Sequence, residues 1–162
     1  MVDHINDTFY PIDFTDNSLT DENLPNYNNL SNSIYILDTD INQFCLNNNK
    51  NLTLIHLNAR SLNKNFPELT NLLSLINNNI SAVCVTETWL NKINENNFQI
   101  AGYQFFSNCR VHKSGGGVGI YVDINLESDL LSQLIISTDI IESVFVQFQQ
   151  PNCGKILIGA IY

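Results

Sequence analysis

The stretch that decides the fold is LTLIHLNARSLNKNFPELTNLLSLINNNISAVCVTETWL, residues 52–90. It opens with an apolar segment that ends at Asn58 and closes with another, residues 82–85, which leads into Glu87. Between them, the apolar residues of 69–76 follow the i, i+3, i+4, i+7 spacing of an amphipathic helix. The pattern therefore predicts a strand–helix–strand unit.

Local signals predict how the helix begins and how the first strand is buried. Asn65 can cap the helix, with Pro67 in its first turn and Glu68 at the third helical position, which completes a capping-box pattern. The apolar residues of 52–57 leave no polar face, so we expect this strand to be buried on both sides. His56 within it is interpreted as a core histidine.

Asn58 and Glu87 each close one of the two apolar segments. The carboxyl ends of parallel strands lie at the same edge of a sheet, where open α/β sheets bind their ligands. An amide and a carboxylate at that edge suit a divalent metal and a phosphate oxygen, because Mg²⁺ prefers oxygen ligands and takes only one or two carboxylates. The alternative is that Asn58 turns the chain and Glu87 caps the segment that follows.

Patterns in the second half of the chain predict further strands. They are expected at 103–109 and 118–122, which form a hairpin, at 141–148 and at 156–162. Residues 126–134 fit either a helix or a loop. Glu142 shares a face with apolar neighbours and needs a donor, so a structural hydrogen bond is its expected role. Tyr162 falls at the carboxyl end of the last strand, where a phenol could reach a phosphate.

Three more side chains are candidates for contact with a phosphate. Trp89 lies just past a strand end, where packing in the core is the simpler interpretation. Arg110 could approach a phosphate and His112 adds charge below neutral pH, although a solvated loop accounts for both equally well. The glycine-rich run 115–119 lacks the Lys-Ser/Thr of a P-loop and leads into a strand, so it is interpreted as a hairpin turn.

Composition limits the classes of protein that fit. The chain has 162 residues, enough for one domain, and 44% of them are hydrophobic, which supports a core. The net charge of −9 argues against a free-standing nucleic-acid binder, which neutralises phosphates with Lys and Arg. That argument is weak here, because the asparagine runs indicate compositional drift, which also removes basic residues.

The cysteines and the N-terminus indicate a compartment. The four cysteines are far apart and form no CxxC pair, so free thiols in a reducing, intracellular compartment are expected, nuclear or cytoplasmic. No secretory signal opens the chain, and no apolar run reaches the ~18 residues that cross a bilayer, so neither secretion nor a membrane partner is expected. Residues 1–50 read as a mostly disordered, Asn- and Asp-rich leader, in which 34–44 could form a helical turn or an edge strand, and residues 51–162 as the domain.

Six segments occur along the chain in a specific order. They are HLNARSL (56–62), TETWL (86–90), GY (102–103), Arg110 with GGGV (115–118), IE (141–142) and IGAIY (158–162). Together they resemble the endonuclease domain of LINE-type (non-LTR) retrotransposon proteins, which carry a reverse transcriptase and belong to the endonuclease/exonuclease/phosphatase superfamily. No single segment is diagnostic, but their shared order and spacing are specific.

The resemblance implies a DNase I-like fold, a four-layer α/β sandwich of two sheets flanked by helices, of which this chain would hold the first half. It also implies hydrolysis of phosphodiesters in DNA with Mg²⁺ or Mn²⁺. By the resemblance, Asn58 orients the phosphate and the waters of the metal, Glu87 binds the metal, and Tyr162 contacts the scissile phosphate. Arg60 stands where the apurinic endonucleases carry an aspartate, which looks normal for the retrotransposon branch.

The family's second half supplies an Asp-x-Asn pair, a further aspartate and a closing Asp-His pair that activates water, and these elements do not follow Tyr162 here. We therefore expect a truncated domain that binds metal weakly or not at all, is inactive by itself, and self-associates through an uncovered sheet face. Two alternatives remain open. One is a phosphatase-type member of the superfamily that acts on phospholipids or nucleotides, and the other is a non-catalytic module whose acidic leader recruits a partner.

Overall fold

The structure, a computed structural model, describes residues 52–76, 80–110, 115–149 and 154–162, all of which belong to one compact unit. The leader, with the element expected at 34–44, lies outside the described residues.

The first sheet contains the predicted strand–helix–strand unit. Its order is β1-β2-β4-β3, built from β1 (Leu54–Asn58), β2 (Ala82–Thr86), β4 (Val118–Asp123) and β3 (Tyr103–Asn108). Strands β1 and β2 are parallel, and helix α2 (Leu62–Leu75) connects them. Strands β3 and β4 are antiparallel, which confirms the predicted hairpin. The parallel pairing brings the carboxyl ends of β1 and β2 to one edge, as expected.

Two details of this unit differ from the prediction. Strand β1 pairs only with β2 among the described residues, and only one of its faces is buried: Ile55 and Leu57 pack against the core beneath the helix, whereas Leu54 is 47% exposed and His56 is exposed rather than in the core. The helix begins at Leu62, three residues before the expected cap, because the fully buried Leu62 side chain joins the core there. Asn65 therefore lies inside the helix, where its amide nitrogen donates to the carbonyl of Ala59 at 2.7 Å.

The second sheet is built around the long strand β7 (Glu142–Gln149). Strands β5 (Ser128–Leu130) and β6 (Ile136–Ser137) pair with it on one side, and β8 (Lys155–Ile161) pairs with it antiparallel on the other. Two short 3₁₀ turns, η1 (Glu95–Asn97) and η2 (Ser132–Leu134), lie in the connections. Residues 126–134 thus contain a strand and a 3₁₀ turn, where a helix or a loop was expected.

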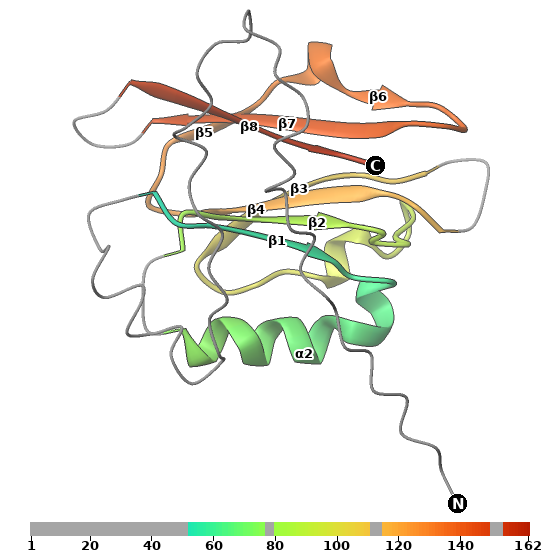
Figure 1. Cartoon of the computed structure of the whole chain (residues 1–162), viewed down its shortest axis with the longest axis horizontal. Helices are drawn as coiled ribbons and strands as arrows, with labels where there is room; N and C mark the ends of the chain where they lie inside the picture. The colour runs from blue at the N-terminus through green and yellow to red at the C-terminus, as the bar shows by residue number, and fades with distance from the viewer. Residues whose placement is uncertain (1–51, 77–79, 111–114, 150–153) are drawn as a thin grey trace, which may run out of the picture. The chain divides into compact units, whose positions relative to one another are not determined.

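Helix α2, the first sheet and the second sheet form successive layers (Figure 1). One apolar core fills the space between the helix and the first sheet: Ala59, Leu62, Leu69, Ile76, Ile80, Val83, Val85, Leu90, Phe98, Cys109 and Tyr121. A second core fills the space between the two sheets: Ala82, Val118, Ile120, Val122, Val144, Val146, Phe148, Ile158 and Ala160. Three of the four expected layers are therefore present in the described part of the chain.

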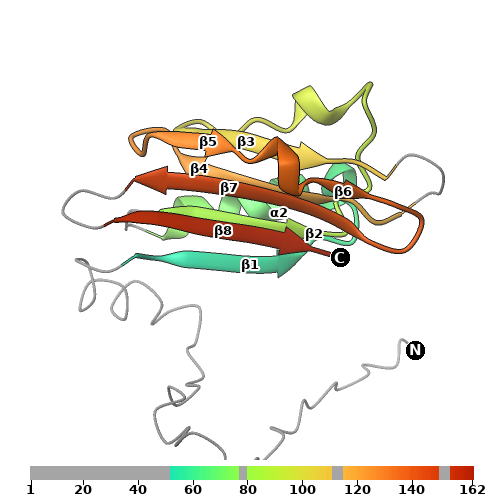
Figure 2. The ribbon, with the colours of Figure 1, turned by 90° about the horizontal axis from the view of Figure 1, so that it is seen from above.

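The uncovered sheet face is the outer face of the second sheet, since the inner faces of both sheets cover each other. On that outer face, Leu157 is 54% exposed and Ile161 is 59% exposed, whereas their strand neighbours Ile158 and Ala160 are buried. Figure 2 shows that β1 and β8, each of which pairs with a single strand among the described residues, run along the same side of the two sheets. Within the described ranges, no helix has the length and apolar character needed to cross a membrane.

Candidate functional site

The loops that follow β1 and β2 run side by side and are fixed to each other by backbone hydrogen bonds. The amide of Ala59 donates to the carbonyl of Thr86 at 2.8 Å, and that of Ser61 donates to the carbonyl of Glu87 at 2.9 Å. The amide of Leu62 then donates to the carbonyl of Thr88 at 2.9 Å. The parallel pairing thus continues past the strand ends and holds the polar residues of both loops in one place.

The same two loops contain unusual backbone geometry. Arg60 and Ser61 follow β1 with φ of 43° and 92°, and Glu87 and Trp89 follow β2 with φ of 51° and 54°. Among the described residues, these four are all the non-glycine residues with positive φ. Residues other than glycine are disfavoured at positive φ, and such backbone strain concentrates at functional sites. The geometry therefore marks this edge independently of its side chains.

Three side chains converge at this edge. The amide nitrogen Nδ2 of Asn58 donates to Oε1 of Glu87 at 2.7 Å, which confirms the expected convergence of the two residues. The hydroxyl of Tyr162, at the end of β8, donates to the same Oε1 at 3.2 Å. Oδ1 of Asn58 accepts from the backbone amide of Arg60 at 3.1 Å, so its amide nitrogen faces the carboxylate.

The charges at the site favour an ionised carboxylate. The pKa of Glu87 lies below its ordinary value, chiefly because of the hydrogen bond from Asn58, with smaller contributions from Tyr162, the charge of Arg60 and Trp89. The negative charge of Glu87 in turn raises the pKa of the Tyr162 phenol. At neutral pH the site therefore presents a carboxylate beside a protonated phenol.

The donor set fits a hard cation that keeps most of its own water. Glu87 supplies one accessible, ionised carboxylate, and Mg²⁺ commonly binds through one or two carboxylates together with waters and substrate oxygens. Among residues 52–76, 80–110, 115–149 and 154–162, no three His, Cys, Asp or Glu side chains are grouped so as to hold a metal. The residues present therefore fit one carboxylate ligand, and further ligands have to come from water or substrate.

Arg110 lies beside this site and forms an ion pair with Glu142. Its Nε donates to Oε1 of Glu142, and its Nη2 donates to Oε2 at 2.9 Å. The Glu142 side chain is fully buried, and it also accepts from the backbone amide of Gly117 at 3.3 Å. The guanidinium carbon lies 5.7 Å from the centre of the Tyr162 ring. Arg110 thus provides the donor that the sequence predicted for Glu142.

Glycines 115–117 lie in the connection between β3 and β4 and lead directly into β4, as predicted, and they also fix the loop after β2. Gly116 accepts from the amide of Trp89 at 2.9 Å, and Gly117 accepts from the amide of Thr88 at 3.2 Å. Gly115, Gly116 and Gly117 all have positive φ. A Cβ at Gly116 would stand 2.5 Å from the guanidinium carbon of Arg110, so a larger residue at this position would have to displace the end group of Arg110.

Trp89 is 47% exposed, so the interpretation that it packs in the core is wrong. Its amide donates to the glycine segment, its φ is positive, and its side chain lies beside Glu87, whose pKa it helps to lower. His112 lies outside the described residues. Thr88 lies in the same loop but was not predicted from the sequence. Its side chain is buried, and its hydroxyl has no hydrogen-bond partner among the described residues. Its only sequence signal is its place between Glu87 and Trp89.

Comparison with known proteins supports the fold. No protein-family model and no curated protein matches the chain. Among the solved structures that resemble it is the AP endonuclease LMAP from Leishmania major, with a TM-score of 0.53 and 19% sequence identity over 68% of this chain. The chain spans 40% of the length of that structure. The described residues therefore have the two-sheet α/β fold of the DNase I-like endonucleases.

Proposed function

We propose that this chain carries the first part of a divalent-metal-dependent DNA endonuclease domain of the LINE-type retrotransposon kind. The observation that carries the proposal is the convergence of Asn58 and Tyr162 on one oxygen of Glu87, at the edge where β1 and β2 end. Two further points support the proposal. The fold of the chain resembles that of a solved AP endonuclease, and open α/β sheets bind their ligands at such an edge.

Each of the three residues has a role that its geometry supports. Glu87 is the metal ligand, because it is accessible and its pKa is lowered. Asn58 orients the carboxylate by donating to Oε1. Because the amide is neutral, Glu87 keeps its negative charge for the cation. Tyr162 carries a protonated phenol at the same place, and a phenol can donate to a phosphate oxygen. When bound, Mg²⁺ or Mn²⁺ would stabilise negative charge on the phosphate.

The general base of such a reaction is not found among the described residues of this site. Glu87 serves as the ligand in this proposal, and Glu142 is buried in its ion pair with Arg110. Residues that act as one catalytic unit are non-additive, so the loss of one member removes nearly all of the rate. We therefore propose that the chain binds metal and DNA phosphate weakly and does not cleave DNA by itself.

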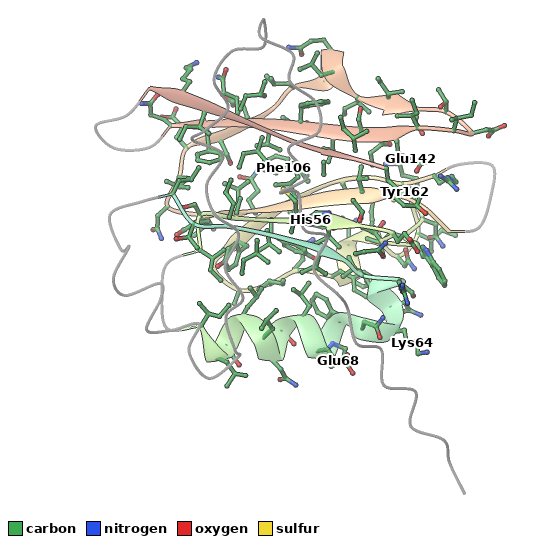
Figure 3. The ribbon with its side chains drawn as sticks, in the orientation of Figure 1. His56, Lys64, Glu68, Phe106, Glu142 and Tyr162 are labelled. Carbon is green, nitrogen blue, oxygen red and sulfur yellow. The ribbon has the colours of Figure 1, made fainter. Side chains whose placement is uncertain are left out.

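The experiment is a pair of assays with matched variants. In the first, fluorescence anisotropy follows a labelled DNA duplex with and without Mn²⁺, for the wild type, Glu87→Gln and Glu68→Gln. Glu68 is an exposed glutamate on α2 (Figure 3) and is the control for loss of a carboxylate. The proposal expects Mn²⁺-enhanced binding that Glu87→Gln removes and Glu68→Gln retains. Equal binding by all three proteins would contradict the role of Glu87.

In the second assay, supercoiled plasmid is incubated with each protein in Mg²⁺ or Mn²⁺. No nicking above background is expected from any of them. Clear nicking by the wild type that Glu87→Gln abolishes would show a complete active site in this chain, and would contradict the proposed inactivity while supporting the metal ligand.

A further inference from the structure

We infer that Arg110 and Glu142 form a positioning pair that holds the phenol of Tyr162 against Glu87, so that Arg110 acts on the ring of Tyr162 rather than on a phosphate. The inference deepens the proposed function and rests on it for the purpose of the pair, but the contacts that define the pair can be tested without metal or DNA.

Glu142 fixes the backbone of Tyr162. Its amide donates to the carbonyl of Tyr162, and the amide of Tyr162 donates back to the carbonyl of Glu142, both at 2.9 Å. This reciprocal pair prolongs the ladder between β7 and β8 by one residue beyond the end of β8. The two residues lie close together at the same end of the sheets in Figure 3.

The backbone pair does not fix the ring, because Tyr162 is 42% exposed and its side-chain torsions are still free to rotate. Arg110 supplies the missing constraint, since its guanidinium carbon lies 5.7 Å from the ring centre, within the range of a cation–π interaction. Glu87 completes the arrangement by accepting from the phenol at 3.2 Å. The ring therefore contacts a cation through its π face and an anion through its hydroxyl.

Arg110 is itself held on two sides. The fully buried carboxylate of Glu142 accepts from both Nε and Nη2, which leaves the guanidinium plane fixed by a two-point ion pair. The backbone of Gly116 packs so closely that a Cβ there would meet the guanidinium. With Nε and Nη2 engaged and its side chain only 15% exposed, Arg110 is placed for the ring and poorly placed for a phosphate in solvent.

The experiment measures the coupling between Glu87 and Tyr162 by ¹⁹F NMR of protein labelled with 3-fluorotyrosine. The six tyrosines are assigned by Tyr-to-Phe variants, starting with Tyr162→Phe. In the wild type, Glu87→Gln should shift the resonance of Tyr162 and leave that of Tyr121 unchanged. Tyr121 is the internal control, since its buried hydroxyl donates to the carbonyl of Phe98 at 2.8 Å, away from Glu87.

The same substitution is then made in an Arg110→Met/Glu142→Leu background. Removing both partners avoids an unpaired buried charge, and replacing such a pair by apolar residues of similar volume is often neutral for stability. The inference expects the Tyr162 shift caused by Glu87→Gln to be largely lost in that background. An undiminished shift would overturn it. Should the double variant fail to fold, Arg110→Lys keeps the cation but loses the planar fork, and a reduced shift is again expected.

A separate measurement distinguishes this inference from the proposed function. Mn²⁺ binding by the wild type reports on Glu87 as a ligand, whereas the fluorine shift reports on the ring in metal-free protein. Absence of Mn²⁺ binding with an intact coupling would contradict the proposed function alone. Metal binding with a coupling that is insensitive to the loss of Arg110 and Glu142 would contradict the positioning role alone.

Discussion

Substitution of Gly116 by alanine is expected to destabilise the domain far more than the same change at Gly102. Both glycines have positive φ, 67° and 85°, so either alanine costs about 1 kcal/mol of backbone strain. A Cβ at Gly102 would meet nothing within 4 Å, whereas one at Gly116 would lie 2.5 Å from the guanidinium carbon of Arg110. Gly102→Ala is therefore the matched control for backbone strain alone.

The additional loss of stability expected for Gly116→Ala comes from the hydrogen bonds that the Arg110 guanidinium would have to give up. An arginine end group can move, but here its movement weakens two hydrogen bonds to the buried carboxylate of Glu142. Hydrogen bonds to charged groups contribute roughly 1.5–3 kcal/mol, so Gly116→Ala should cost about 3 kcal/mol in all. At roughly 4 °C per kcal/mol, the expected loss in Tm is about 12 °C, against about 4 °C for Gly102→Ala.

Thermal and urea unfolding followed by circular dichroism would measure both losses. The same two substitutions in the Arg110→Met/Glu142→Leu background complete the test, because the side chain at position 110 can then move without weakening an ion pair, and both alanines should cost about the same. If Gly116→Ala and Gly102→Ala are equally destabilising in the wild type, the reasoning about the close approach of Arg110 is refuted.

Three further predictions concern the carboxylate, a thiol and the exposed surface. Because the pKa of Glu87 is lowered chiefly by Asn58, the stability that Glu87 contributes should be complete above its ordinary value of 4.5 and lost only as the pH falls through the lower folded value. In Asn58→Ala, an NMR titration should place that transition at higher pH, and an unchanged transition would contradict the assigned cause. Burial raises the pKa of Cys109 to about 11, so mass spectrometry should find it alkylated slowly at pH 8 when folded and rapidly when unfolded. We propose that the chain self-associates through the outer face of the second sheet and the edges of β1 and β8. Light scattering should then detect oligomers, and the Leu157→Lys/Ile161→Lys variant should form fewer of them. A monodisperse wild-type monomer would count against the proposed self-association.

The parts of the fold that were predictable depend on local patterns. Both apolar strands, the helix between them and the later hairpin follow from periodicity and glycine placement. The convergence of Asn58 and Glu87 was also predictable, because parallel pairing alone brings the ends of two such strands together. No distant contact had to be known for these features.

The features that were missed depend on partners far away in the sequence. Residues 52–57 were expected to be buried on both faces because their apolar pattern does not reveal that one face of β1, the face of Leu54 and His56, is left exposed. The helix start was misplaced because Asn65 offers a local cap, while burial of Leu62 and its hydrogen bond to Thr88 begin the helix earlier. The same holds for Arg110, whose partner Glu142 lies 32 residues away on another sheet.

The strongest test of the account is a titration of the purified chain with Mn²⁺, followed by electron paramagnetic resonance, in the wild type, Asn58→Ala, Glu87→Gln and Glu68→Gln. The account predicts one binding site that Glu87→Gln abolishes, that Asn58→Ala weakens by about tenfold, as expected for a residue that orients a ligand, and that Glu68→Gln retains. Binding that survives Glu87→Gln unchanged, or that is lost in Glu68→Gln as well, would contradict the assignment of Glu87 as the metal ligand.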